Sequence, residues 1–433
     1  MRSHTLNNTT LTDIFPVTDL GQTKQKVLNW IQRFNTFCLL DNHQYNIAPH
    51  TQECVLGAGI RRKIHMNGDN ALERLQDFID EKKAWLFGHL CYDLATEAGQ
   101  ISSPHTDHIQ FPDLFFFEPE IIIRLNEKEM IIEAEDPEEV FTSINSSSQY
   151  SKHQLQNVPV IQNRLQKDEY LSRVRQLQKH ILRGDCYEIN FCQEFFAGKV
   201  TIDPAEVYQK LVTISPNPFS ALYRLDDKWL LCASPERFLK KEGCTVLSQP
   251  IKGTSKRELA DKAKDELNKN ELFQSAKDRS ENVMVVDLVR NDLARICKEG
   301  TVKVDELYGI YSFPQVHQMI STISGELKKN ISFAELIRAT FPMGSMTGAP
   351  KKRVMELIGQ YEKTKRGIFS GCLGYISPEK DFDLNVVIRS IMYNASSAYL
   401  SFQAGSGITY YSDPEKEWEE CLLKAEALQK VLS

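Results

Sequence analysis

The sequence predicts an α+β protein in which strands and helices follow no regular alternation. Short segments rich in isoleucine, phenylalanine and tyrosine are typical of strands, and longer segments with apolar residues at helical spacing are typical of helices. Several strand-like segments follow one another directly. A doubly wound parallel sheet is therefore disfavoured, because each of its strands would be followed by a helix.

The first part of the chain contains both kinds of element. The pattern NALERLQDFIDEKKAW (70–85) predicts a helix, and FFFEPEIIIRLN (115–126) and EMIIEAE (129–135) predict strands. In SINSSSQYSKHQLQN (143–157), serine, glutamine and asparagine replace the hydrophobic periodicity. We expect a linker or an exposed loop there.

The second part begins with a helix, DEYLSRVRQLQKHILRGD (168–185), which should close at Gly184. CYEINFCQEFFAG (186–198) and FSALYRLDDKWLLCAS (219–234) predict strands. Two further helices are predicted later in the chain. AKDRSENVMVVDLVRNDLARIC (276–297) contains no proline or glycine, and SDPEKEWEECLLKAEALQKVL (412–432) opens with a helix-start signature.

Composition excludes several classes of partner. The net charge of −6 and the absence of long lysine or arginine blocks argue against a surface for nucleic acid or anionic lipid. No apolar run reaches the roughly 18 residues that a membrane span needs. The ten cysteines are scattered singly without a CxxC pair, as reduced buried thiols would be. We therefore expect a cytoplasmic protein without disulfides or a zinc site.

Each of the last two predicted helices carries a pair of acidic residues three positions apart. Asp278 and Glu281 lie on one face of the first helix, and Glu417 and Glu420 on one face of the second. Magnesium takes oxygen ligands, and one or two protein carboxylates often suffice to hold it. The two pairs could thus meet around one Mg²⁺ ion, or they could be exposed acidic faces beside nearby lysines.

Two short stretches contain candidate functional residues at strand ends or turns. PIKGTSKR (250–257) presents Lys252 just before a Gly-Thr turn, either as a reactive amine or as a solvated loop lysine. In QAGSGITYYSDP (403–414), Gly405 and Gly407 would let the backbone approach a ligand closely, or they mark a plain turn.

The loop FPMGSMTGAPKKRVMELI (341–358) does not fit a phosphate-binding P-loop. That motif needs glycine, lysine and serine or threonine in succession, and here two residues separate Gly348 from Lys351. Its small residues could instead present backbone N–H groups to an anion at the start of a helix.

Together these stretches resemble the chorismate-utilising enzyme family, strongly over residues 165–430 and less specifically around FGHLCYDLATEAG (87–99). The motifs that carry the resemblance are SPERF (234–238), PIKGT (250–254), KDRSENVMVVDLVRNDLAR (277–295), VHQMISTISGEL (316–327), FPMGSMTGAPKKRVMELI (341–358), GYIS (374–377), VVIRSI (386–391), AGSGI (404–408) and SDPEKEWEECLLKA (412–425).

The resemblance implies an α+β fold of two large packed antiparallel β-sheets with outer helices. It also implies an accessory domain over residues 1–150 and a chorismate-binding catalytic domain over residues 160–433. Carried over residue by residue, it implies Mg²⁺ bound by Glu281 and Glu420. Glu417 and Asp278 take supporting, water-mediated positions, and Asp278 departs from the glutamate that family members often have there.

Chorismate carries two carboxylates, so its site must supply positive charge. The resemblance implies eight substrate-binding residues, six at the carboxylates (Tyr375, Arg389, Gly405, Ser406, Gly407 and Lys424) and two at the ring (Thr254 and His317). Arginine suits this role because its planar fork pairs with a carboxylate through two hydrogen bonds.

The resemblance also implies two catalytic residues. Glu236 matches the family's general acid/base, which requires burial to raise its pKa. Lys252 matches a lysine of those members that aminate chorismate at C4 to 4-amino-4-deoxychorismate, a precursor of 4-aminobenzoate and folate. It would attack C2 as the C4 hydroxyl leaves, and we expect desolvation and neighbouring cations to lower its pKa.

Other activities of the family remain as alternatives. Members that make anthranilate tend to have alanine at the position of Lys252. Those that make isochorismate or salicylate have a water-activating lysine at the position of Glu188, where aminating members usually have glutamine, so the role of Glu188 stays open. A non-enzymatic binding protein would be expected to lose the acidic residues. No glutaminase motif is present, so ammonia should come from solution or from a separate glutamine amidotransferase.

Overall fold

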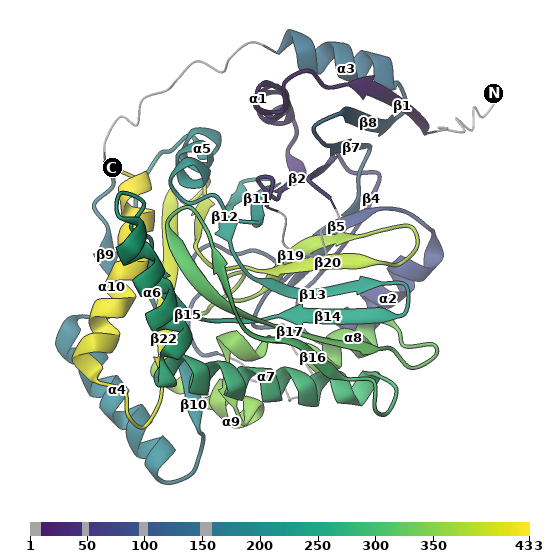
Figure 1. Ribbon diagram of the computed structural model, residues 1–433. Helices are drawn as coiled ribbons and strands as arrows, with labels where there is room; N and C mark the ends of the chain where they lie inside the picture. The colour runs from purple at the N-terminus through teal and green to yellow at the C-terminus, as the bar shows by residue number, and fades with distance from the viewer. Residues whose placement is uncertain (1–9, 46–51, 95–102, 148–157) are drawn as a thin grey trace.

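The computed structural model describes residues 10–45, 52–94, 103–147 and 158–433. Within these residues the strands form two large sheets, in which neighbouring strands run antiparallel. The helices lie outside them (Figure 1). The predicted α+β class with two large packed antiparallel sheets and outer helices is thus confirmed.

The first sheet has twelve strands and runs from the N-terminal strand to the strands that carry the chain's later motifs. In spatial order its strands are β1 (Leu11–Pro16), β8 (Glu129–Ala134), β7 (Ile121–Leu125), β3 (Cys54–Ala58), β2 (Thr36–Asp41), β11 (Phe219–Leu225), β12 (Lys228–Ser234), β21 (Ser390–Asn394), β22 (Tyr399–Ile408), β10 (Glu188–Gly198) and β18 (Gly348–Ala349), with β9 (Gln162–Asn163) also paired to β10.

The second sheet has ten strands. In spatial order these are β15 (Ile251–Lys256), β17 (Val316–Glu326), β14 (Thr245–Gln249), β13 (Arg237–Glu242), β20 (Phe382–Val386), β19 (Cys372–Ile376), β5 (Leu86–Leu90), β6 (Leu114–Glu118) and β4 (Arg62–Met66), with β16 (Lys303–Ser312) also paired to β17.

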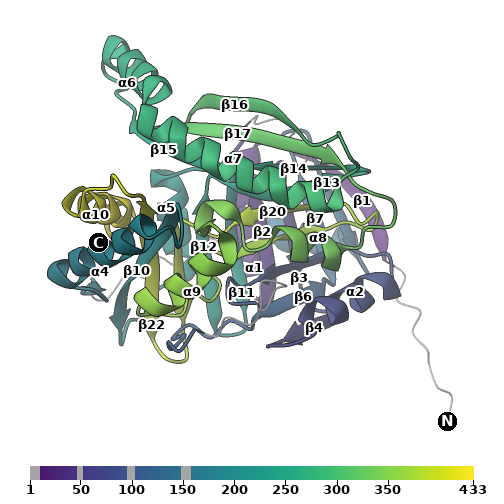
Figure 2. The ribbon, with the colours of Figure 1, turned by 90° about the horizontal axis from the view of Figure 1, so that it is seen from below.

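Ten α-helices and one 3-10 turn are found in the described part of the chain. They are α1 (Leu20–Ile31), α2 (Ala71–Glu81), α3 (Pro137–Ser146), α4 (Lys167–Leu182), α5 (Pro204–Ile214), α6 (Lys262–Gln274), α7 (Ala276–Ile296), α8 (Phe333–Thr340), the 3-10 turn η1 (Gly344–Met346), α9 (Lys351–Tyr361) and α10 (Pro414–Val431). Helix α7 packs against β15 and β17 of the second sheet, and α10 against β22 of the first. Figure 2 shows α6 extending from the edge of the molecule beyond α7.

Two apolar clusters hold these layers together. One combines Tyr223 and Leu230 of the first sheet with Phe87 and Leu384 of the second, and so fills the space between the sheets. The other packs α1, α3, α4, α5, α9 and α10 onto the opposite face of the first sheet. Burial of these side chains is the main driving force for the fold.

The predicted elements are confirmed where their patterns were strongest. β8 alternates half-buried and buried residues, as the period of a strand requires. Helix α4 ends beside Gly184, which takes a positive φ of 83° that favours glycine. Ser275 caps α7 by accepting a hydrogen bond from the N–H of Asp278, and Asp413 caps α10 ahead of Pro414.

The expected linker at 143–157 is wrong for its first residues. Helix α3 continues to Ser146 because Ile144 is buried and Phe141 stacks on Phe15, with ring centroids 4.1 Å apart. Residues 148–157 lie outside the described part of the chain, as do residues 95–99 of the segment FGHLCYDLATEAG.

The division into residues 1–150 and 160–433 stays a proposal about how the chain is organised. Strands from both ranges lie in both sheets: β2 pairs with β11, and β5 pairs with β19. All ten cysteines are free thiols, nine of them buried, as predicted. No described helix has the length and apolar character needed to cross a bilayer.

Candidate active site

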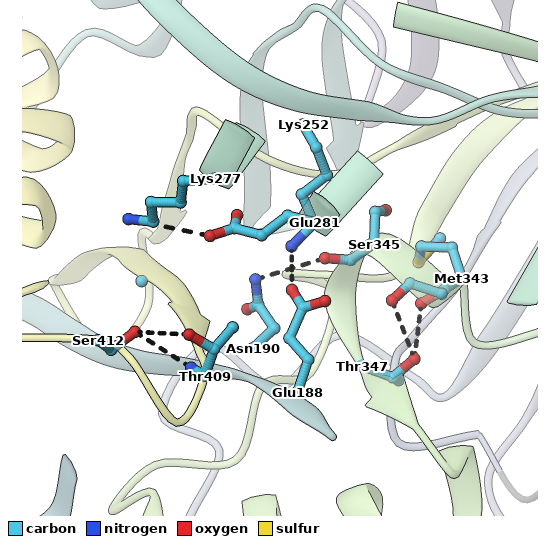
Figure 3. Close-up of polar contacts among 12 residues, drawn as sticks. Glu188, Asn190, Lys252, Lys277, Glu281, Met343, Ser345, Thr347, Thr409 and Ser412 are labelled. Carbon is cyan, nitrogen blue, oxygen red and sulfur yellow. Dashed lines mark hydrogen bonds and ion pairs between the residues drawn. The ribbon is translucent and has the colours of Figure 1, made fainter. Parts of the chain in front are cut away.

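Lys252 and Glu188 form a buried ion pair between the two sheets. Lys252 belongs to β15 at one end of the second sheet, and Glu188 is the first residue of β10 in the first sheet. The Nζ of Lys252 donates to Oε1 of Glu188 at 2.5 Å, and the two side chains are 10% and 4% exposed (Figure 3). The contact brings together two residues from separate sheets.

The charge state of Lys252 differs from the sequence-based expectation. Burial by itself lowers the pKa of Lys252, but the carboxylates of Glu188, Glu281 and Glu236 outweigh burial and raise this pKa above its usual value. The neighbours are anions, whereas cations were expected, so Lys252 is an ammonium in the ligand-free chain. The expected lowering of its pKa is wrong for this state, and its role as a nucleophile stays a prediction.

Two glycines allow close approaches around this pair. A Cβ on Gly407 would lie 2.5 Å from Oε1 of Glu188 and 3.1 Å from Nζ of Lys252. Gly253, which follows Lys252, has a φ of 92°, and a Cβ there would lie 3.0 Å from the side chain of Asp278. The backbone of β15 thus approaches α7 more closely than other residues would allow.

Glu236 lies in the same region and is held by a serine. It precedes β13, is buried, and accepts a hydrogen bond from the Oγ of Ser345 at 2.6 Å. Burial raises the pKa of Glu236 to about 7, although the Ser345 hydrogen bond and the charge of Lys252 oppose this rise. The raised pKa that an acid/base role requires is therefore present.

Arg389 faces Glu236 through space and has no hydrogen bond or ion pair from its guanidinium to the described residues. Burial lowers the pKa of Arg389 to about 10, against the attraction of Glu236. Its backbone takes a positive φ of 49°, which is unusual for a residue with a long side chain. A half-buried guanidinium without a partner is suited to hold an anionic group.

One residue of each acidic pair, Glu281 on α7 and Glu417 on α10, lies close to the same lysine. Lys277 belongs to α7, and its Nζ is 3.8 Å from Oε1 of Glu281 (Figure 3). The same Nζ is 3.6 Å from Oε1 of Glu417 on α10. Glu420 on α10 is paired with Lys424 at 2.8 Å. Burial raises the pKa of Glu281 to about 7. Burial also acts to raise the pKa of Glu420, but Lys424 and Lys277 lower it overall.

These carboxylates fit a hard divalent cation. Oε1 of Glu281 and Oε2 of Glu417 are buried and accept no hydrogen bond, and an unsatisfied buried carboxylate oxygen is costly. Oxygen donors of this kind are the ligands that Mg²⁺ prefers. Among the described residues, no cluster of three or more acidic, histidine or cysteine side chains is close enough to hold a metal as it stands.

The remaining predicted site residues divide into two groups. Gly405, Ser406 and Gly407 lie on β22 opposite β10, and the carbonyl of Gly405 accepts a hydrogen bond from Lys424 at 2.9 Å. They are thus beside the acidic cluster.

Thr254, His317 and Tyr375 lie apart from these contacts. Thr254 is exposed on β15. The ring of His317 contacts Ser312 at 2.8 Å and Asp265 of α6 at 3.2 Å. Tyr375 lines a cavity of about 60 Å³ that also contains Arg237 and Asp383. The roles of these three residues toward a substrate stay predictions.

Two residues of the site were missed by the sequence-based reasoning. Ser345 lies in a loop that was singled out for its small residues, but its partner Glu236 is 109 positions away along the chain. Lys277 could have been found, because it precedes Glu281 by four positions on a predicted helix and such pairs commonly interact.

Comparison with known proteins identifies the family and the fold of this chain. Residues 32–430 match the family of chorismate binding enzymes. The chain belongs to this family. Two solved structures support the same chorismate-binding fold. The menaquinone-specific isochorismate synthase of Escherichia coli has a TM-score of 0.78 at 17% identity, covering 98% of this chain and 94% of that one. Anthranilate synthase component I of Streptococcus pneumoniae has a TM-score of 0.74 at 24% identity, covering 89% and 94%.

Relatives of higher identity within the chorismate binding enzyme family carry two kinds of name. Aminodeoxychorismate synthase component 1 is 38% identical in Escherichia coli, over 63% of this chain and 59% of that protein. In Bacillus subtilis it is 30% identical, over 80% and 76%. An anthranilate synthase component I-like protein of Synechocystis is 33% identical, over 84% and 75%. The match thus spans less than two thirds of the Escherichia coli relative.

Proposed function

We propose that this chain is an aminodeoxychorismate synthase component that aminates chorismate at C4 to 4-amino-4-deoxychorismate, for 4-aminobenzoate and folate biosynthesis. The observation that carries the proposal is Lys252, a buried amine in one site with the acid Glu236. The names of the Escherichia coli and Bacillus subtilis relatives support the same activity. Anthranilate formation, suggested by the Synechocystis relative, is the second candidate.

The substrate's two carboxylates are bound by positive charge and by backbone. The guanidinium of Arg389 has no hydrogen-bond or ion-pair partner within the described part of the chain, and such a group can hold a carboxylate through two hydrogen bonds. Lys424 and the strand around Gly405 and Gly407 form a second proposed anion-binding position beside α10. Thr254 and His317 are proposed to lie near the substrate ring, and Tyr375 near one of its carboxylates.

Lys252 and Glu236 carry the covalent steps. Glu236 with a pKa of about 7 is half protonated near neutral pH, which suits a group that must give a proton to the leaving C4 hydroxyl. The uncharged amine of Lys252 forms a bond to C2 as the C4–O bond breaks. Ammonia then adds at C4, and the bond from C2 to Lys252 breaks.

Glu281 and Glu420 would hold Mg²⁺, with Glu417 and Asp278 in support. When bound, Mg²⁺ would neutralise substrate carboxylate charge beside the bond that breaks. In the ligand-free chain Lys277 supplies positive charge between Glu281 and Glu417.

The ammonia is proposed to come from a separate glutamine amidotransferase subunit, and the enzyme to act in the cytoplasm. Residues 1–150 are proposed to be an accessory part of the chain and residues 160–433 its catalytic part.

Product analysis tests the proposal. With chorismate, Mg²⁺ and ammonium salt at alkaline pH, the purified chain should make aminodeoxychorismate, measured as 4-aminobenzoate after an aminodeoxychorismate lyase is added. With glutamine in place of ammonia it should be nearly inactive until a glutaminase subunit is added. Fluorescent anthranilate as the main product would replace the proposal by its alternative.

A further inference from the structure

Glu188 is the direct partner of Lys252. Its Oε1 lies 2.5 Å from Nζ, and the ammonium of Lys252 makes no other hydrogen bond or ion pair with the described residues. Other charged groups act on Lys252 from a greater distance. These are Glu281 of α7, Glu236 before β13 and Glu420 of α10, with the cations Lys277 beside Glu281 and Arg389 beside Glu236.

The backbone around Glu188 is fixed on both sides. Glu188 pairs with Ala349 of β18, and its neighbour Ile189 pairs with Ile408 of β22. A Cβ on Gly348 would lie only 2.1 Å from the carbonyl oxygen of Glu188, and Gly407 leaves space for the carboxylate. The two glycines on the adjoining strands therefore let those strands approach Glu188 closely, and its carboxylate accepts the hydrogen bond from Nζ.

The geometry raises a chemical problem for the proposed reaction. An ammonium has no free electron pair, so Lys252 must lose a proton before it can attack C2. Its side chain is only 10% exposed, and a bound substrate would shield it further. The proton must therefore pass to a group inside the site, and the carboxylate of Glu188 already shares a hydrogen bond with it.

We propose that Glu188 is the internal base that takes the proton from Lys252 at the start of the reaction and returns it at the end. This inference rests on the proposed function, because it assigns a role within the same covalent reaction. It gives Glu188 a task that a glutamine at this position could not perform, since an amide does not accept a proton near neutral pH.

The proton balance closes over the cycle. The proton moves from Nζ to Oε1 of Glu188, and the freed electron pair forms the N–C2 bond. The ring double bonds shift, and the C4–O bond breaks with a proton from Glu236, releasing water. Ammonia adds at C4 while the C2–N bond breaks and its electrons return to Lys252. The amine recovers its proton from Glu188, and the new C4 ammonium gives one to Glu236.

The test measures formation of the Lys252 adduct without ammonia, by quenching and intact mass spectrometry. Chorismate and Mg²⁺ are kept at concentrations that saturate the rate at each pH. From about pH 5.5 to about pH 6.5 Glu236 is mostly protonated, since its pKa is about 7. The parent rate should stay level over this range, because the proton of Lys252 stays inside the pair.

Glu188→Gln keeps the volume of the side chain but removes the base. At about pH 6 it should slow adduct formation by roughly 100-fold or more, the usual contribution of a general base. The variant's rate should rise about tenfold per pH unit, because Lys252 must now lose its proton to the solution. Asp292→Asn serves as the matched control: it breaks a buried 2.7 Å ion pair with Lys351 and should keep the level profile.

Two results would overturn the inference while leaving the proposed function in place. One is a Glu188→Gln variant with the parental rate and a level profile. The other is a parent rate that itself rises tenfold per pH unit. That measurement does not depend on whether any variant folds. A parent that makes aminodeoxychorismate without any Lys252 adduct would remove the inference together with the covalent step. A parent that makes neither would instead refute the proposed function.

Discussion

Ser345→Ala tests whether Glu236 is the acid of the proposed reaction. Ser345 donates to Oε1 of Glu236 at 2.6 Å, and this hydrogen bond favours the charged carboxylate. Removing it should raise the pKa of Glu236 above the present value of about 7. An acid must be protonated to act, so the rate falls as pH rises through this pKa. The fall should therefore move to higher pH in the variant.

The size of the shift follows from the strength of the bond. A hydrogen bond to a charged group contributes about 1.5 to 3 kcal/mol, and 1.36 kcal/mol corresponds to about one pKa unit. The midpoint of the fall should thus move upward by about one to two pH units. At a pH well below the midpoint, the variant and the parent should have similar rates.

The assay is ammonia-dependent turnover between about pH 6.5 and about pH 9.5, with uncharged ammonia held constant so that its own titration does not enter. Thr347→Val is the matched control. It removes a hydroxyl that lies in the same loop as Ser345 but donates to the carbonyl of Met343 and not to Glu236 (Figure 3). An unchanged midpoint in Ser345→Ala, with normal folding, would refute the assignment of Glu236 as the acid.

Three further predictions concern the charged residues of the site. Glu281→Gln and Glu420→Gln each remove a proposed Mg²⁺ ligand at constant volume, and should raise the Mg²⁺ concentration needed for half activity at least tenfold in titrations. Lys277→Gln removes the cation between the acidic pairs, so calorimetry should detect tighter Mg²⁺ binding. Weaker binding would contradict the idea that Lys277 competes with Mg²⁺ for these carboxylates. Lys252→Ala should lose most turnover and the adduct seen by mass spectrometry, and Lys252→Arg should not restore them, because guanidinium stays protonated.

The helices that carry the acidic pairs could be predicted because their signals are local. The run that became α7 has no proline or glycine, and α10 starts at Asp413 and Pro414. Once both helices were expected, the i, i+3 spacing of Asp278 and Glu281 was enough to place both carboxylates on one face. The meeting of the two helices at Lys277 depended on packing, which no local pattern contains.

The surroundings of Lys252 could not be predicted in the same way. Its partner Glu188 is 64 positions away and belongs to the other sheet, so their contact depends on how the two sheets pack. Without that partner, burial alone suggests a lowered pKa, whereas a carboxylate at 2.5 Å reverses the direction. Helix α3 shows a similar limit, because its polar residues gave no sign that Ile144 would be buried.

The space left by the missing side chain of Gly407 has a consequence for how natural variants of this protein should be judged. A methyl group there would press on Oε1 of Glu188 and Nζ of Lys252, which are the ends of flexible side chains and can move aside. Gly407→Ala should therefore fold and be made at normal levels while its Lys252–Glu188 contact is displaced. Screens that score abundance or heat resistance would class such an allele as harmless, and only a growth test without supplied 4-aminobenzoate would reveal the defect.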